Sequence, residues 1–143
     1  MTQITRIPQM SADFPFAHMT ERVIVAAYRV HNTLGAGFLE SVYVRSLQVE
    51  LRLEGIDAAF EAPITVRYRD HVVGEFRADV LVAGEVIVEI KAVTELTPMH
   101  EAQLVNYLNA TGKSVGLLLN FGKSVQVKRK IQSKNLRQSA KSA

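Results

Sequence analysis

Apolar side chains recur at helical spacing in the first third of the chain. The stripe consists of Val23, Ala27, Val30 and Leu34. Positions i, i+4, i+7 and i+11 are typical of one face of an amphipathic helix, and Thr20 is its predicted N-cap. Gly35 and Gly37 interrupt this pattern. A second helix is expected from about residue 38 to residue 54, because Gly55 is a residue type that commonly ends helices.

The pattern changes to strand spacing in the middle of the chain. Apolar and polar residues alternate from Ile64 to Tyr68, which predicts a strand, and Asp70-His71 is the expected turn. Residues 72–82 and 86–93 are the next two predicted strands, joined by residues 83–85. The third strand is apolar on both alternating faces, which is typical of a central strand covered on both sides.

The remaining elements are one helix and one or two strands. Pro98, which is tolerated in the first turn of a helix, precedes a helical segment that ends near Gly112. Residues 115–121 predict an apolar strand, and residues 124–127 predict a short edge strand. The predicted class is therefore α/β (α+β), with helices packed on a mixed central sheet of four to five strands in the order ααβββαβ(β).

Length and composition indicate one soluble domain. The chain has 143 residues, 48% of them hydrophobic, and no cysteine, which excludes a disulfide framework, a thiolate zinc site and a cysteine nucleophile. We interpret residues 1–15 as an irregular leader, residues 16–127 as the domain and residues 128–143 as a flexible basic tail. No apolar stretch approaches the roughly 20 residues that cross a bilayer, and residues 1–16 do not resemble a secretory signal, so the expected location is the cytoplasm without membrane attachment.

The net charge of +3 hides a division along the chain. Residues 123–143 contain seven Lys or Arg and no acid, which leaves ten basic and fourteen acidic residues in 1–122. The tail, which includes Lys128, Arg129 and Lys130, would contact phosphates or only solubilise the chain, and both interpretations stay open.

Glu40 is unusual within the second predicted helix. On a helical wheel its direction falls within about 60° of the apolar residues Tyr43, Val44, Leu47 and Leu51. The wheel therefore predicts that Glu40 points with the apolar side chains, where a carboxylate without a partner costs several kcal/mol or becomes neutral. The competing interpretation is an acid at a helix N-terminus that the helix dipole stabilises.

Asp79 and Glu89 lie on neighbouring predicted strands. If residues 83–85 form a three-residue connection, Val82 pairs with Val86 and Asp79 lies directly opposite Glu89; a two-residue turn would place the two acids on opposite faces. Opposed carboxylates on one face repel each other unless a cation lies between them. A solvated sheet face is the competing interpretation, and an internal network of ion pairs with Lys91 and Arg77 is another.

Carboxylates that converge beside a lysine are typical of a hard-cation site. Oxygen ligands suit Mg²⁺ or Mn²⁺, and Mg²⁺ commonly takes one or two protein carboxylates and completes its shell with water and substrate phosphate. Such an ion polarises a phosphoryl oxygen and activates water, and a nearby ammonium group stabilises developing charge.

Four sequence elements carry a family resemblance. The segment from Gly37 to Tyr43, GFLESVY, resembles the signature of the GxxExxY proteins, and Asp79 followed by Glu89-Ile90-Lys91 is similar to the D…ExK core of the PD-(D/E)XK nuclease superfamily. Gln103 and Tyr107 resemble the QxxxY element of RecB-type members. The resemblance runs in order from about residue 20 to residue 127, although Ala78 stands where the superfamily name has proline.

The resemblance implies a restriction-endonuclease-like core and a role for each residue. Asp79 and Glu89 would be metal ligands, Lys91 the catalytic lysine, and Glu40 a further acidic ligand or base partner. Gln103 would orient the lysine or contact the nucleic-acid backbone, with Tyr107 beside it.

The leading hypothesis is thus a Mg²⁺- or Mn²⁺-dependent nuclease that hydrolyses phosphodiester bonds, of DNA more readily than of RNA. The alternative is a catalytically silent module that binds nucleic acid or a partner protein. The sequence leaves the oligomeric state open, including a homodimer, and a nuclease scaffold does not by itself guarantee activity.

Overall fold

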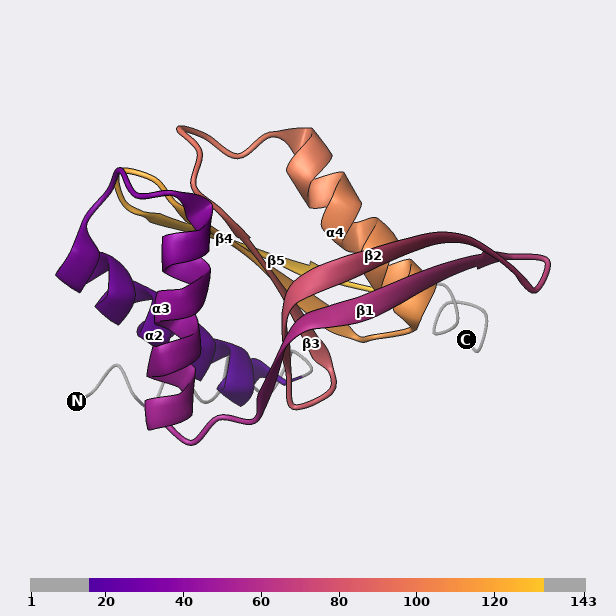
Figure 1. Ribbon diagram of the computed structural model, residues 1–143, viewed down its shortest axis with the longest axis horizontal. Helices are drawn as coiled ribbons and strands as arrows, with labels where there is room; N and C mark the ends of the chain where they lie inside the picture. The colour runs from indigo at the N-terminus through magenta and orange to yellow at the C-terminus, as the bar shows by residue number, and fades with distance from the viewer. Residues whose placement is uncertain (1–15, 133–143) are drawn as a thin grey trace, which may run out of the picture.

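The computed structural model describes residues 16–132, which form three helices and one five-stranded sheet (Figure 1). The elements are α2 (Ala17–Leu34), α3 (Glu40–Leu53), β1 (Ala58–Tyr68), β2 (His71–Val82), β3 (Val86–Lys91), α4 (Pro98–Thr111), β4 (Val115–Phe121) and β5 (Val125–Ile131). This order confirms the predicted α+β class and the predicted succession of elements, with the final strand present.

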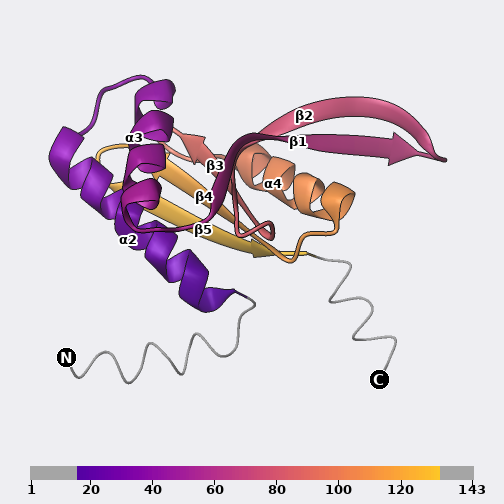
Figure 2. The same cartoon turned by 60° about the horizontal axis from the view of Figure 1, so that its bottom comes forward.

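The sheet is mixed and its strands follow chain order, β1-β2-β3-β4-β5. Only the β3–β4 pair is parallel, and α4 forms the crossover between these two strands. The other three pairs are antiparallel, and the distal part of the long β1–β2 hairpin extends past α4 (Figure 2). The turn of this hairpin consists of Arg69 and Asp70, both at positive φ, one residue earlier than predicted.

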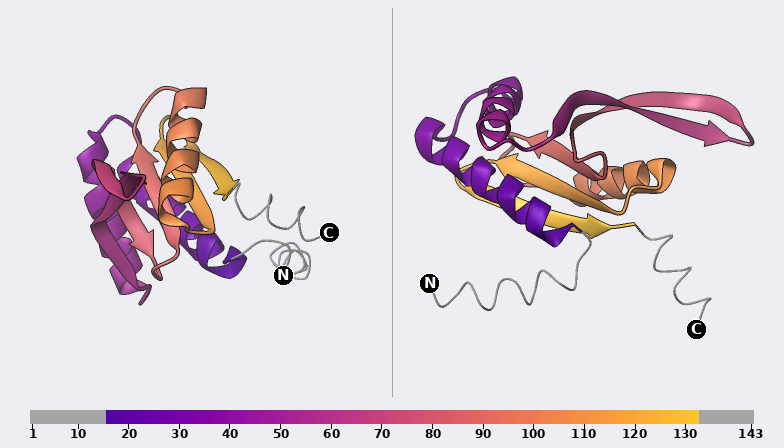
Figure 3. Two further views of the ribbon diagram at one scale, coloured as in Figure 1. Left: turned by 90° about the vertical axis from the view of Figure 1, so that its right-hand side faces the viewer. Right: turned by 90° about the horizontal axis from the view of Figure 1, so that it is seen from below.

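Helices cover both faces of the sheet, as the left panel of Figure 3 shows. On one face α2 and α3 pack on alternate strand residues, among them Val80, Val88 and Leu117. On the other face α4 packs through Leu104 and Leu108 on Ile87 and Leu118. Because β3 is buried along both faces, it is the central strand that its apolar run predicts.

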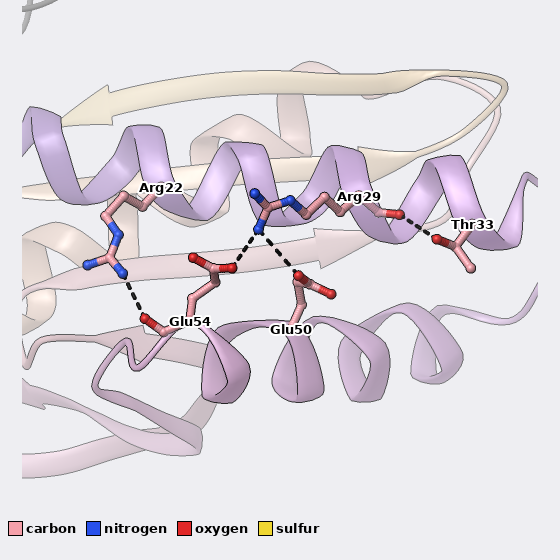
Figure 4. A network of polar contacts seen from close by, with 5 residues as sticks. All are labelled: Arg22, Arg29, Thr33, Glu50 and Glu54. Carbon is pink, nitrogen blue, oxygen red and sulfur yellow. Dashed lines mark hydrogen bonds and ion pairs between the residues drawn. The ribbon is translucent and has the colours of Figure 1, made fainter.

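Polar contacts join α2 to α3 on the solvent side of their interface (Figure 4). The Arg29 guanidinium lies 2.6 Å from Glu54 Oε2 and 3.5 Å from Glu50 Oε2, and Arg22 donates a hydrogen bond to the Glu54 carbonyl. These exposed ion pairs add little free energy of folding, and the two helices are held mainly by the buried apolar residues between them and the sheet.

Three expected boundaries are wrong. The first helix begins at Ala17, so Thr20 lies within it and is not an N-cap; its buried hydroxyl donates to the Ala17 carbonyl instead. The first strand begins at Ala58 and not at Ile64, and Pro63 is tolerated because β1 is an edge strand.

The third correction concerns the start of the basic tail. β5 continues to Ile131 along the whole length of β4, so residues 128–131 belong to the domain. Lysines on an edge strand also discourage pairing with other chains. The expected leader 1–15 and the rest of the expected tail, residues 133–143, lie outside the described residues. Within residues 16–132 none of the helices is both long and apolar enough to cross a membrane.

Candidate active site

The connection between β2 and β3 sets the position of two carboxylates. Val82 pairs with Val86 across residues 83–85, followed by Leu81 with Ile87 and Val80 with Val88. Asp79 and Glu89 are next in this register, as a three-residue connection predicts. Their neighbours Leu81 and Ile87 pack on the α4 side of the sheet, and the alternation of a strand places Glu89 on that side as well.

Hydrogen bonds from side chain to main chain join the strands at this pair. The N–H of Asp79 donates to Glu89 Oε2 at 3.1 Å, and the N–H of Ile90 donates to Asp79 Oδ2 at 2.8 Å. The regular β2–β3 ladder ends one pair earlier, at Val80 and Val88. Among residues 16–132 nothing donates a hydrogen bond to Asp79 Oδ1 or Glu89 Oε1, so each carboxylate keeps one oxygen for another ligand.

Burial makes the charged form of this pair costly. Glu89 is only 7% exposed. Loss of hydration, followed by the charge of Asp79, raises the pKa of the Glu89 carboxyl to about 8. Loss of hydration also raises the pKa of Asp79, against the hydrogen bond from Ile90 and the positive charge of Lys91. A cation between the two groups would remove this penalty.

Lys91 ends β3 on the same face as Glu89 and is half-buried. Its positive charge opposes the rise in the pKa of the Asp79, Glu89 and Glu40 carboxyls. Within residues 16–132 none of the ion pairs includes Lys91, and Arg77 donates to the Glu61 carbonyl rather than to either acid. The network of direct ion pairs with Lys91 and Arg77, the purely structural interpretation of these acids, is therefore absent from the described residues.

Glu40 lies at the margin of this group. It is the first residue of α3 and is exposed, so the wheel was wrong to place it with the apolar side chains; the buried face begins one turn later, at Tyr43. Even so, partial loss of hydration and the charge of Asp79 raise the pKa of its carboxyl, and Lys91 and His100 oppose the rise. The structure thus brings Glu40 near Asp79 and Lys91 at the N-terminus of a helix.

Gln103 and Tyr107 share one face of α4. Tyr107 is buried in the apolar cluster that contains Ala78 and Ile87. Loss of hydration, together with the charges of Glu89 and Asp79, raises the pKa of its phenol. Gln103 is exposed, and among residues 16–132 no hydrogen bond joins its amide to Lys91.

Tyr43 fixes the loop that leads to Glu40. Its ring is fully buried and stacks on Phe121 at 4.6 Å between centroids. The phenol donates to the Gly35 carbonyl at 2.6 Å and accepts from the Phe38 N–H at 3.3 Å. The tyrosine of the GFLESVY segment therefore has a positional role that the sequence pattern did not reveal.

Asn120 is a site residue that sequence reasoning missed. It is fully buried opposite Lys91 in the parallel β3–β4 register. Its Oδ1 accepts from the Val93 N–H and its Nδ2 donates to the Val93 carbonyl, both at 2.9 Å. The side-chain amide thereby holds the chain two residues after Lys91. The available signal was a polar residue inside the apolar run 115–121.

The three expected phosphate-binding residues lie on both faces of β5. Lys130 forms an ion pair with Glu101 of α4 at 2.6 Å, and Arg129 donates to the Thr20 hydroxyl on the opposite face at 3.1 Å. Lys128 is exposed. Two of the three cations, Arg129 and Lys130, thus already contact other side chains of the domain.

The donor set fits a hard cation held by few protein ligands. Residues 16–132 contain no group of three or more His, Cys, Asp or Glu side chains arranged to hold a metal ion. Mg²⁺ needs only one or two carboxylates when water and substrate complete its shell, and Asp79 Oδ1 and Glu89 Oε1 are two such oxygens from adjacent strands.

One of the two solved structures compared with this chain shares its fold. The crystal structure of SSO0001 aligns with this chain with a TM-score of 0.53 at 17% sequence identity. The alignment covers 71% of this chain and 56% of SSO0001, so this chain spans little more than half of that protein. An alkaline exonuclease from Laribacter hongkongensis aligns with a TM-score of 0.44 at 14% identity, over 81% of each chain. A comparison with curated protein sequences gives no match.

A sequence profile identifies the family. The profile described as the PD-(D/E)XK nuclease superfamily matches residues 17–133, nearly the whole described region. The mixed sheet with α4 as its parallel crossover is a restriction-endonuclease-like core. Asp79 lies on β2, and Glu89 and Lys91 lie on β3. The chain belongs to the PD-(D/E)XK nuclease superfamily.

Proposed function

We propose that this protein is a metal-dependent nuclease that hydrolyses phosphodiester bonds, with DNA as its first substrate class. The observation that carries the proposal is the opposed pair Asp79 and Glu89, each with one oxygen that receives no hydrogen bond from residues 16–132, beside Lys91. Proteins of this superfamily generally use divalent metal ions. We also assign the chain to the GxxExxY group within it, on the segment from Gly37 to Tyr43.

In this proposal the two carboxylates would hold Mg²⁺ or Mn²⁺. The ion, when bound, supplies charge stabilisation at the phosphoryl oxygens and lowers the pKa of a water ligand. The low exposure of Glu89 strengthens every interaction of the pair with a cation, because less water screens it. Binding would also displace the proton that Glu89 holds near neutral pH, so metal uptake releases protons.

Lys91 would orient the attacking water and stabilise the negative charge that develops at the phosphate. Its ammonium group has no ion-pair partner within residues 16–132, so no carboxylate has to be displaced before substrate arrives. Glu40 would accept a proton or hold an additional water at the edge of the site. Gln103 and Tyr107 would contact the nucleic acid beside the pair, and Lys128 with its neighbours would add phosphate contacts.

A cleavage panel tests the proposal. The protein is incubated with single- and double-stranded DNA and RNA in Mg²⁺, in Mn²⁺ and in excess chelator. We expect cleavage with metal, loss with chelator and loss in Asp79→Asn. If no substrate is cut with either metal, the proposed function is wrong.

A second candidate, a binding module that does not cut, follows from the absence of a three-ligand cluster in the described region. Affinity for uncut nucleic acid separates the two. Under this candidate the double variant Asp79→Asn, Lys91→Ala keeps its affinity and the wild type shows no turnover.

A further inference from the structure

A second feature lies next to the carboxylate pair. An open groove with a volume of about 680 Å³ runs between α4 and the distal part of the β1–β2 hairpin. Its walls include Val66 and Phe76 from the hairpin and Met99, Gln103 and Tyr107 from α4. The right panel of Figure 3 shows the hairpin running alongside α4.

The groove exposes apolar and aromatic surface. The exposed fraction is 46% for Phe76 and 80% for Met99. Isolated exposed apolar residues are common, but these two face one concave site. The amide side chains of Gln103 and Asn106 line the same groove. The site thus offers flat apolar contact together with hydrogen-bond donors and acceptors.

Contacts with Gly74 and Tyr107 hold the Phe76 ring in position. A Cβ at Gly74 would lie 3.0 Å from the Phe76 ring, so a larger residue there would press on the ring. The ring also contacts Tyr107, with centroids 5.6 Å apart and planes tilted by 39°. Glycine in a strand interior often marks such a close approach.

Tyr107 lies between the groove and the strands that carry the carboxylate pair. This ring lines the groove and belongs to the same apolar cluster as Ala78, next to Asp79, and Ile87, two residues before Glu89. A ligand in the groove would therefore lie beside the strands that carry the two carboxylates.

The hairpin beside the groove carries cations. Arg67, Arg69 and Arg77 are exposed, against two acids in residues 66–77, Asp70 and Glu75. The Arg77 guanidinium is held by the Glu61 carbonyl at 3.2 Å, near the Asp79 end of β2. Arginines on the hairpin that forms one wall of an aromatic groove favour a polyanion that carries flat rings over an uncharged apolar partner.

We propose, resting on the proposed function, that this groove binds unpaired nucleobases of a single strand whose backbone passes the Asp79–Glu89 pair. A base stacks on Phe76, and Gln103 and Asn106 hydrogen-bond its edge. Paired bases in a duplex have their faces covered by neighbouring bases, so the groove selects single-stranded segments, overhangs or frayed ends. Base stacking on an aromatic side chain tolerates any sequence, so base identity has little effect.

Fluorescent oligonucleotides test this in the Asp79→Asn background, where cleavage is blocked. Anisotropy with a single strand and with a matched duplex gives the affinities, and a 2-aminopurine in the single strand reports stacking. We expect tighter binding of the single strand and quenching on binding. Phe76→Ala should weaken single-strand binding about tenfold and remove the quenching, whereas Phe76→Trp should retain the affinity and the quenching. The control is Tyr28→Ala, which removes an exposed aromatic residue on α2 and should change neither the affinity nor the quenching.

Three results would each overturn the inference. The first is equal affinity for the single strand and the duplex, and the second is a Phe76→Ala variant with the parent's melting temperature and the parent's affinity. The third is a concentration-dependent dimer that Phe76→Ala abolishes, because that result would assign the groove to a second copy of the chain. The proposed function fails separately. If the wild type cuts nothing while Phe76-dependent single-strand binding persists, the groove is a binding site on a silent scaffold. If the wild type cuts and Phe76→Ala alters neither affinity nor kcat/KM, the groove proposal alone is wrong.

Discussion

The main chain of Asp79 donates a hydrogen bond to the side chain of Glu89 at 3.1 Å, across the point where the β2–β3 ladder stops. Because the Asp79 carboxylate accepts in turn from the main chain of Ile90, both acids are oriented by the opposite strand. The register of one hairpin thus places two carboxylates side by side with one oxygen each not engaged by residues 16–132.

Lys91 is predicted to act on the reaction rather than on folding. Replacing Lys91 by Ala removes a cation that has no ion pair within residues 16–132, so the variant should fold normally. The account predicts that kcat falls about 100-fold or more, since the lost group stabilises charge that develops in the transition state. Lys113→Ala, in the connection between α4 and β4, is the matched control. A Lys91→Ala enzyme with unchanged kcat would remove Lys91 from the mechanism.

The metal-free protein is predicted to lose stability as pH rises from about 5 to 8. Glu89 has a pKa of about 8 in the folded protein against 4.5 ordinarily, so the folded state binds the extra proton. Its contribution to the free energy of unfolding is complete below the ordinary pKa and is lost as pH rises through 8. Asp79 acts in the same direction, because its pKa is also raised.

Thermal unfolding in chelator at several pH values measures this effect. Glu89→Gln should flatten the profile, since glutamine does not titrate, and Mg²⁺ should protect the wild type most at high pH. Glu75→Gln, an exposed acid on β2, serves as the control. A wild-type melting temperature that rises steadily between pH 5 and 8 would contradict the prediction.

Tyr43→Phe is predicted to loosen the loop before Glu40. The variant keeps the buried ring and its stacking on Phe121 and loses the hydroxyl that joins Gly35 to Phe38. The expected cost is about 1 kcal/mol of unfolding free energy, measured by urea denaturation. Hydrogen exchange should rise at the Phe38 amide while the centre of α2 stays protected. Unchanged exchange at Phe38 would show that the loop is held by other contacts.

Asn120→Ala is predicted to release the segment after Lys91. The Val93 N–H and carbonyl lose their shared partner, which should cost about 1–3 kcal/mol in urea denaturation. If the amide positions Lys91, kcat should fall while KM for oligonucleotide stays near the wild-type value. Asn120→Asp should recover part of kcat, since it still accepts from the Val93 N–H. Equal kcat in all three proteins would leave Asn120 a purely structural residue.

The sequence predicted the register of the candidate site because a local feature determines it. Three residues, 83–85, connect β2 and β3, and this length alone decides that Asp79 faces Glu89 rather than the opposite side. Gly35, Gly55 and Gly112 likewise end their helices at positive φ, where glycine carries no steric cost.

Features set by distant contacts could not be predicted in this way. The start of β1 at Ala58 depends on pairing with Val82, because residues 58–63 lack a clear alternation of their own. Thr20 has the residue type of an N-cap, yet its hydroxyl bonds within the helix and to Arg129, 109 positions away. The exposure of Glu40 and the contact of Asn120 with Val93 similarly follow from how helices and loops meet the sheet.

Calorimetric titration of the purified protein with Mn²⁺ at pH 8 tests the central claim most directly. We expect the wild type to bind Mn²⁺ with release of protons, and Asp79→Asn and Glu89→Gln each to lose at least tenfold in affinity. The control Asp70→Asn, which changes an acid at the tip of the β1–β2 hairpin, should keep the wild-type affinity. Binding of equal strength in all four proteins, or no binding by the wild type, would contradict the assignment of Asp79 and Glu89 as a metal-dependent nuclease centre.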